Sequence, residues 1–283
     1  MVRFLSLSSG SCGNCYFLSL EQEGKQPAGL IIDAGVSLRR MKKVLLGEGY
    51  SFDSFSDILV THDHLDHIRH LGALCKHLGK PVHATPRLFE ALLHHSFTSD
   101  WIGPCRADLE QNVWNEIIPG RAWARYFIVP HDATQTVGFA LQLDEVKFVV
   151  MTDLGRMTEE ALNFARQADV LVIESNYDRQ MLLNGTYTQE LKMRICHARG
   201  HLSNEDCAEA IKTAWHPGLR HIFLCHLSEN NNTPELAFDC SARALKSIGF
   251  EPTYERSSLF FREDQSVSLH TLPRHVPSTI FNL

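Results

Sequence analysis

The sequence predicts an α/β fold in which two packed β-sheets carry helices on their outer faces. Short apolar strands open the chain as hairpins and then alternate with helices, and this order is repeated in the second half. The helices are apolar along one face, whereas several strands are apolar throughout. Two sheets packed together with helices outside would bury both kinds of surface. Because no low-complexity linker interrupts the 283 residues, we expect a single domain over 1–283.

Strands are expected where apolar or alternating runs end at turn residues. In chain order they are 3–8, 15–20, 29–32, 58–60, the segment at Val82, 122–129, 136–143, 146–151, 170–174, 221–225, the segment near Thr253, and 259–261.

Helices are expected where apolar residues recur at a spacing of three or four. They are 37–48, a helix beginning near Asp66 and continuing to Leu78, a helix after Pro86, 159–167, helical stretches up to 196, 204–215 and 234–248. Residues 96–120 show no clear period and predict a long excursion that could form a substrate-facing flap. The segment 264–283 is polar, contains prolines and is expected to be a peripheral tail.

The bulk composition limits the class of protein. No apolar run approaches the ~18 residues that span a bilayer, and the first residues lack the apolar core of a signal peptide. We therefore expect a cytosolic protein without a membrane segment, with its eight cysteines reduced. The net charge of −6 argues against a broad basic surface for nucleic acid, but it is compatible with an enzyme that binds one strand through a few local contacts.

Two local patterns allow more than one interpretation. Cys12-Gly13-Asn14-Cys15 could be a redox pair or half a zinc knuckle, but no second pair completes four thiolates, and a tight turn is favoured. The basic run 39–43 is more typical of a solvated helix face than of a phosphate track.

The strongest signal is a cluster of metal-binding side chains. His62, His64, Asp66 and His67 lie within six residues, directly after the apolar strand 58–60. Alternate residues of an extended loop point the same way, so His62 and His64 can converge on one ion. The following helix then turns Asp66 and His67 toward a second ion. Imidazole and carboxylate suit zinc and, with more oxygen ligands, iron or manganese.

Four ligands do not complete two metal ions, so further ligands must follow other strands. His131, Asp153 and His226 each come directly after a strand that reads as buried. These residues complete two ligand sets: His62, His64 and His131 for one metal, Asp66, His67 and His226 for the other, and Asp153 as the bridge.

With these residues in place, the chain resembles the metallo-β-lactamase superfamily over about residues 1–262. The HxHxDH run, the later His, Asp and His, and an early acidic motif at Asp33 carry the resemblance. It implies a four-layer αββα sandwich with two divalent metal ions at the edge of the sheets. It also implies that Asp33 orients a ligand loop instead of binding metal.

Three longer strings resemble the YycJ (WalJ)-type members of the superfamily. They are Ser8–Cys15 (with Cys12 where serine is expected), Ile173–Asp178 with Gly200–Asn204, and Cys225–Glu235. The resemblance implies a 5′→3′ exonuclease that acts on the 5′ end of DNA, with RNA not excluded.

Glu174 and His201 resemble a pair found in related nucleases, in which an acid orients a histidine near the leaving group. A departing alkoxide needs a proton, which an imidazolium held by a carboxylate can supply. The expected mechanism is attack by a hydroxide that bridges two metals, with His201 as general acid, Glu174 as its partner and Asp66 as a further catalytic residue. The alternative for His201 is a contact at the start of the helix capped by Ser203.

Two rival functions share most of these features. A thioesterase or lactonase of the same fold would use the same ligands but has less need of Glu174 and His201. A non-catalytic metal-binding partner protein would keep the fold, although the complete ligand set argues against it.

Overall fold

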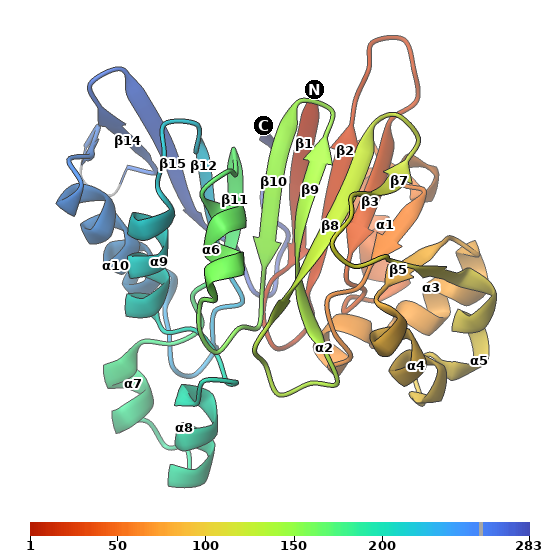
Figure 1. Cartoon of the computed structure of the whole chain (residues 1–283), viewed down its shortest axis with the longest axis horizontal. Coiled ribbons are helices and arrows are strands. Elements are labelled where there is room, and N and C mark those ends of the chain that lie inside the picture. The colour runs from red at the N-terminus through yellow and green to blue at the C-terminus, as the bar shows by residue number, and fades with distance from the viewer. Residues whose placement is uncertain (255–256) are drawn as a thin grey trace. The chain divides into compact units, whose positions relative to one another are not determined.

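The computed structural model describes residues 1–254 and 257–283, which form two mixed β-sheets with helices (Figure 1). The chain divides into two compact units. Unit 1 comprises Met1–Tyr126, Ala133–Val146 and Pro273–Leu283, and unit 2 comprises Phe127–Asp132 and Lys147–Leu272. In these described ranges, every helix is too short or too polar to cross a bilayer.

Unit 1 contains a seven-stranded sheet in the order β16-β1-β2-β3-β4-β5-β6. The pairs among β1, β2 and β3 are antiparallel, and those from β3 to β6 are parallel. The strands are β1 (Val2–Ser8), β2 (Cys15–Leu20), β3 (Ala28–Ile32), β4 (Asp57–Leu59), β5 (Val82–Ala84), β6 (Arg106–Asp108) and β16 (Phe281–Asn282). Unit 1 also holds β7 (Asn115–Ile118), β9 (Thr136–Leu143) and most of β8 (Ala122–Val129).

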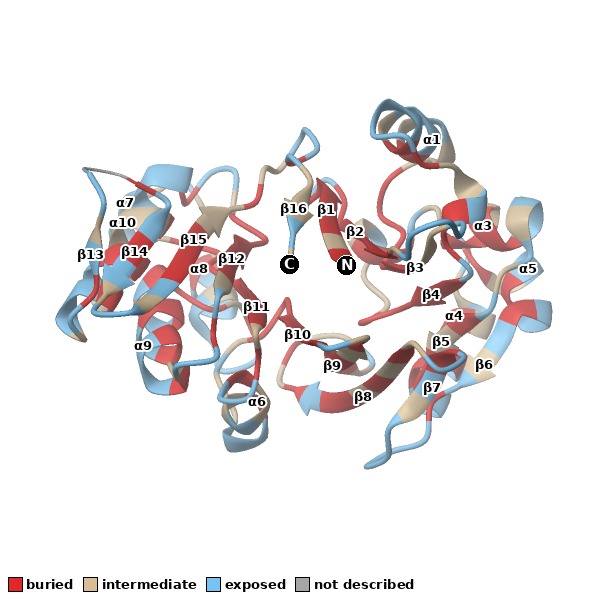
Figure 2. Cartoon of the chain, turned by 90° about the horizontal axis from the view of Figure 1, so that it is seen from above, coloured by how far each residue is buried: buried red, intermediate tan, exposed pale blue. Residues whose placement is uncertain are grey.

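The helices of unit 1 bury their apolar faces against this sheet. They are α1 (Leu38–Gly47), α2 (Leu65–Ile68), α3 (Leu71–Leu78), α4 (Pro86–His94) and α5 (Ser99–Ile102), with short 3₁₀ turns η1 (Phe52–Ser54) and η2 (Gly103–Cys105). Met41 and Leu45 of α1 pack in one cluster with Phe17 and Ile58 of the strands. Side-chain caps begin α1 and α4: the hydroxyl of Ser37 accepts from the amide of Arg40, and that of Thr85 accepts from the amide of Leu88. Figure 2 shows β1 to β4 as largely buried.

Unit 2 is built on parallel strands. β10, β11, β12 and β15 run in parallel, and β14 and β13 follow them antiparallel at one edge. These strands are β10 (Val146–Met151), β11 (Val170–Glu174), β12 (His221–Cys225), β13 (Glu251–Pro252), β14 (Leu259–Arg262) and β15 (Gln265–Thr271). The helices are α6 (Glu159–Ala165), α7 (Arg179–Asn184), α8 (Gln189–Cys196), α9 (Asn204–Ala214) and α10 (Pro234–Ser247). Every residue of β11 is buried, as in parallel sheets covered on both faces.

Most predicted strands are confirmed to within one residue, but the predicted helix from Asp66 to Leu78 is broken. It forms α2 and α3, with a turn at Arg69 and His70. The carbonyls of Asp66 and His67 accept from the amides of Asn14 and Ala34, and the amide of His70 donates to Ala34. Bonds to neighbouring loops therefore replace the bonds that would continue the helix.

Two further segments differ from expectation. Residues 96–120 show no clear period in the sequence but contain α5, η2, β6 and β7, and a substrate-facing flap there stays a prediction. The segment 264–283 is not a peripheral tail, because β15 pairs with both β12 and β14, and β16 pairs with β1. Val267 and Leu269 alternate with serines that made the segment look polar, yet both are buried. The single-domain expectation stays a prediction.

If β15 is part of the core, Leu269→Ala should destabilise the protein by about 2–5 kcal/mol, because it removes a fully buried side chain and leaves a cavity. Urea unfolding followed by circular dichroism measures this difference. Val276→Ala is the control, since that side chain is 59% exposed and should change stability by less than about 0.5 kcal/mol. Equal stability of the two variants would mean that β15 adds little to the core.

Candidate metal centre

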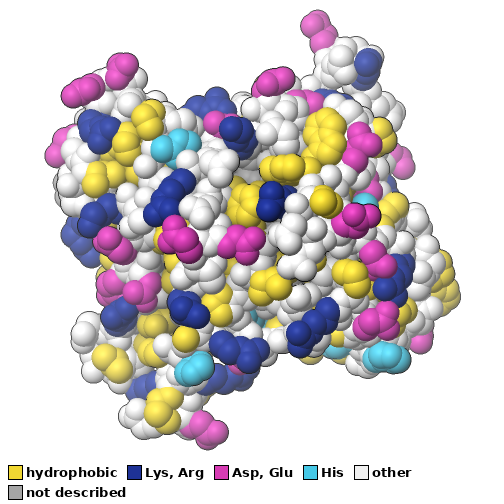
Figure 3. Space-filling view, viewed as in Figure 1, with side chains coloured by type: hydrophobic (Ala, Val, Ile, Leu, Met, Phe, Trp, Pro, Cys, Tyr) yellow, Lys and Arg dark blue, Asp and Glu magenta, His cyan; other side chains and the backbone are white. Residues whose placement is uncertain are grey.

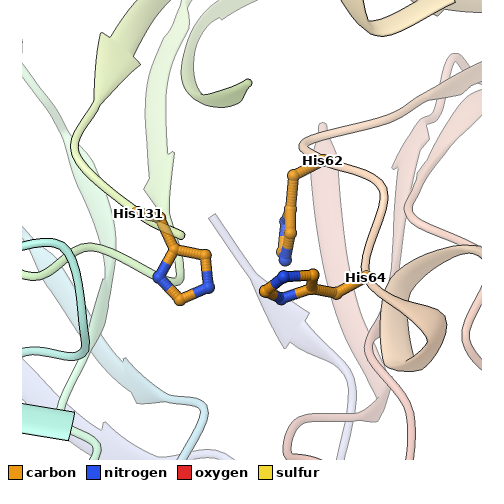
Figure 4. A group of neighbouring side chains, drawn as sticks. All are labelled: His62, His64 and His131. Atoms are coloured by element: carbon orange, nitrogen blue, oxygen red, sulfur yellow. The ribbon is translucent and has the colours of Figure 1, made fainter. Parts of the chain in front are cut away.

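Unit 1 supplies a loop of clustered imidazoles directly after β4. His62 and His67 are fully buried, and their ring centroids lie 4.1 Å apart. The ring centroid of His64 lies 4.8 Å from that of His62. Figure 4 shows His62 and His64 on this loop and draws His131, which follows β8 and belongs to unit 2. Asp66 is half-buried at the start of α2, with Oδ2 3.5 Å from Nε2 of His67.

The carboxylate of Asp33 holds this loop in place. Its Oδ1 accepts from the amide of Thr61 at 2.9 Å, and its Oδ2 accepts from the Thr61 hydroxyl at 2.8 Å. Nδ1 of His67 lies 2.7 Å from the same Oδ2, so Nδ1 carries the proton. The contacts of Asp33 with the loop agree with the orienting role expected for this residue.

Asn14, which no sequence pattern singled out as a site residue, also contacts the cluster. Its side-chain amide lies 2.9 Å from Nε2 of His67, the nitrogen that lacks the proton, and 3.2 Å from Oδ2 of Asp66. The approach depends on Gly35, where an added Cβ would lie 1.8 Å from the carbonyl of Asp66. Asn14 lies inside the Ser8–Cys15 string, so the resemblance of that string was the available signal. In the same turn Cys12 is exposed, Cys15 is buried, and both are free thiols.

Unit 2 brings together the other predicted residues. Single ligand atoms of Asp153, Glu174, His201 and His226 all lie within 4.8 Å of one another. Oδ1 of Asp153 lies 3.2 Å from Nδ1 of His226 and 3.7 Å from Nε2 of His131.

Glu174 is the centre of this group. Its Oε1 accepts from Nδ1 of His201 at 2.8 Å and also from Nδ1 of His226 at 2.9 Å. Its Oε2 accepts from the amides of Leu154 and Leu202, both at 3.0 Å. Glu174 thus orients two imidazoles and two loops, and its contact with His226 was not foreseen.

The charges of this group stabilise each other. Burial opposes the ionisation of Glu174, but the charge of His201 and the hydrogen bonds from both histidines lower its pKa below the ordinary value. Burial also opposes a charge on His201, yet Glu174 and Asp153 raise the pKa of His201. The pKa of His131 is lowered, chiefly by burial.

One pattern runs through both units: five of the clustered imidazole rings are held by the protein through Nδ1. His67 uses Asp33, His62 uses the Thr61 hydroxyl at 3.0 Å, and His131 uses the carbonyl of Gly200 at 2.7 Å. His201 and His226 use Glu174. In the neutral rings of His62, His67, His131 and His226, such bonds favour the tautomer in which Nε2 has the lone pair that a metal ligand needs. The donor set therefore fits divalent metal ions that accept imidazole and carboxylate.

The backbone is strained at three of these positions. Asp33, Asp153 and His226 have φ values of 61°, 55° and 52°. These lie in the left-handed region, which residues other than glycine rarely adopt. Each residue follows a strand directly or after one residue, so the chain turns sharply where the strand ends. Strain of this kind clusters at functional sites.

A buried amide network, which the sequence analysis did not identify, holds the loops of unit 2. The side-chain amide of Asn176 donates to the carbonyl of His226 at 2.8 Å. Asn232 donates to the carbonyls of Ser175 and Asn176 and exchanges hydrogen bonds with Asn204. All these residues belong to the strings that resemble the YycJ type or lie beside them.

Comparison with known proteins agrees with this picture. Residues 29–226 match the model of the "Beta-lactamase superfamily domain". Exodeoxyribonuclease YycJ of Bacillus anthracis is 32% identical over 251 residues, which are 88% of this chain and 91% of the relative. Exodeoxyribonuclease WalJ of Streptococcus pneumoniae is 31% identical over 239 residues, 83% of this chain and 85% of the relative.

Among solved structures, unliganded yeast PDE1 has a TM-score of 0.69 at 11% identity and covers 98% of this chain and 99% of its own. Zn²⁺-bound PqqB of Methylobacterium extorquens has a TM-score of 0.65 at 16% identity and covers 99% of this chain and 100% of its own. These two likenesses concern the fold alone and confirm the predicted class, an α/β sandwich. With the family match over most of its length and the two exodeoxyribonuclease relatives, the chain belongs to the metallo-β-lactamase superfamily and is of the YycJ/WalJ type.

Proposed function

We propose that this protein is a cytosolic metal-dependent nuclease that degrades DNA from its 5′ end. The names of the YycJ and WalJ relatives support a nuclease. The observation that carries the proposal is the contact of Glu174 with both His201 and His226, because it joins a proton donor to a candidate metal ligand. A thioesterase or lactonase has less need of such a donor.

The ligand assignment is part of this proposal. It rests on the sequence pattern and on the Nδ1 bonds described in each unit. His62, His64 and His131 are assigned to one metal ion, Asp66, His67 and His226 to a second, and Asp153 to both. Divalent ions such as zinc, manganese or iron would make water a better nucleophile and offset the charge of the phosphate. Asp66 also remains our candidate for a further catalytic residue.

The residues of the chain have separate tasks in this reaction. Asp33 and Glu174 hold imidazole rings through Nδ1 and prevent them from turning. The side chain of His201 is 23% exposed, whereas that of His226 is 3% exposed, so His201 can meet a substrate. With Nδ1 bound to Glu174, its other nitrogen can give a proton to the departing 3′-oxygen. The negative charge of Glu174 favours the protonated ring before that step.

The direct test is digestion of 5′-phosphorylated single-stranded and duplex DNA by the manganese- or zinc-loaded protein. We expect products that shorten from the 5′ end, followed on 3′-labelled strands. Turnover of thioesters or lactones with intact DNA would favour the small-molecule rival. Absence of all three activities, with less than one metal ion per chain, would favour the non-catalytic rival.

His201→Ala should reduce turnover of DNA by about 10²–10⁴-fold and leave the metal content unchanged, because it removes the proton donor and no assigned ligand. The loss should be much smaller on a phosphodiester with a nitrophenolate leaving group, which departs without a proton. His77→Ala, which alters an exposed histidine, is the control. Equal losses on both substrates, or a loss of metal, would reject the general-acid role.

Asp33→Asn should lower metal affinity by about 10–100-fold while the protein stays folded. The substitution replaces Oδ2 by an NH₂ group, which cannot accept the hydrogen bond from Nδ1 of His67. The His67 ring would then lose the contact that orients it. Competition titration with a zinc-binding dye measures the affinity without any need for activity. Asp53→Asn, at an exposed carboxylate, is the control. An affinity of Asp33→Asn equal to that of the control would contradict the orienting role.

A further inference from the structure

The segment Arg179–Gly200 is basic in an acidic protein. It contains α7, α8 and the loop that leads to His201. Its basic residues are Arg179, Lys192, Arg194 and Arg199, and its acidic residue is Glu190, so its net charge is +3 against −6 for the chain. Figure 3 shows several Lys and Arg side chains in the region where Figure 1 places α7 and α8. A polyanion would be attracted locally to this part of unit 2.

Three of these four cations are either paired with a carboxylate or buried. Arg179 donates to Asp206 at 2.8 Å, and Arg194 pairs with Asp132 at 2.5 Å. Lys192 is buried, and its Nζ donates to the carbonyl of Leu183 at 2.7 Å. Their charges are therefore compensated or turned inward.

Arg199 differs from the others. Its Nε and Nη2 both donate to the carbonyl of His131, at 3.1 and 2.9 Å, so the guanidinium is fixed by a neutral acceptor. Within residues 1–254 and 257–283 it forms no ion pair with a carboxylate, and the residue is exposed. An oriented and uncompensated guanidinium has the geometry and charge that a phosphate group binds.

The position of Arg199 is fixed beside the candidate site. The carbonyl of the next residue, Gly200, accepts from Nδ1 of His131. Arg199 therefore binds the backbone of His131, and Gly200 binds its ring. An added Cβ at Gly200 would lie 2.1 Å from the carbonyl of Ile195, so this loop is closely packed on the end of α8. His201, the proposed proton donor, follows at once.

We propose that Arg199 binds a backbone phosphate of the DNA strand and positions that strand next to His201. This proposal rests on the proposed nuclease function and adds a substrate-binding residue to it. The two N–H groups that hold the His131 carbonyl set the plane of the guanidinium, and its other N–H groups are those that would meet the phosphate. A chain with net charge −6 can in this way hold one strand through a local contact.

The test measures binding of the metal-loaded protein to a 3′-labelled, 5′-phosphorylated phosphorothioate oligonucleotide, which resists cleavage, by fluorescence anisotropy at several salt concentrations. Arg199→Gln can still donate to the His131 carbonyl but has no charge. We expect it to bind several-fold more weakly and to lower the slope of log K against log salt by about 0.7, the value for one single-strand phosphate contact. Arg179→Gln, with the same charge change on the same segment, should keep the wild-type slope.

Other results would overturn the proposal. An Arg199→Gln slope equal to that of wild type, or an equal fall in Arg179→Gln, would mean that Arg199 makes no specific phosphate contact. Loss of metal from Arg199→Gln would show that Arg199 instead holds the His131 loop. If wild type cleaves DNA and only the slope prediction fails, Arg199 is excluded while the nuclease function stands. If wild type neither binds nor cleaves DNA, the proposed function itself is lost.

Discussion

Two buried carboxylates, Asp33 in unit 1 and Glu174 in unit 2, orient three of the clustered imidazoles, those of His67, His201 and His226. A carboxylate removed from water is costly unless every oxygen has a hydrogen-bond donor. Asp33 accepts from the amide and hydroxyl of Thr61 and from Nδ1 of His67, and Glu174 accepts from two imidazole Nδ1 atoms and two main-chain amides. The requirement to satisfy these oxygens therefore fixes the ring tautomers and the loops together.

The ends of the strands add a second constraint. Asp33, Asp153 and His226 adopt left-handed backbone conformations that cost of order 1–3 kcal/mol each in isolation. Neighbouring loops contact these residues: the Asn176 side chain donates to the carbonyl of His226, and the amide and hydroxyl of Thr61 donate to the carboxylate of Asp33. Neutral amides and hydroxyls are suited to this task because they bind carbonyl and carboxylate oxygens without adding charge near the imidazoles.

The electrostatics of the protein are local. A net charge of −6 would repel a polyanion at long range, but solvent and salt screen such charges beyond about 10 Å. What matters at the site is which cations are already paired. Arg179 and Arg194 form ion pairs that tie α7 and α8 to other parts of unit 2, whereas Arg199 contacts a carbonyl. These three arginines of one segment therefore differ in how far their charge is compensated, because their hydrogen-bond partners differ.

The sequence by itself determined most of the strands and the fold class, and it showed the cluster of metal-binding residue types after 58–60. Apolar runs such as 170–174 have few alternatives to a buried strand, and the spacing of His62, His64, Asp66 and His67 is visible without a structure. Only the tertiary structure decided features that depend on distant segments. Loops from Asn14 and Ala34 end α2 early, and pairing with β12 and β14 places β15, with the buried Val267 and Leu269, inside the sheet. Glu174 likewise bonds to two histidines that lie far from it in the chain. Long-range contacts of the same kind are made by Asn14, Asn176 and Arg199. Local patterns record which face of a segment is apolar, but hydrogen-bond partners are set by the packing of whole elements.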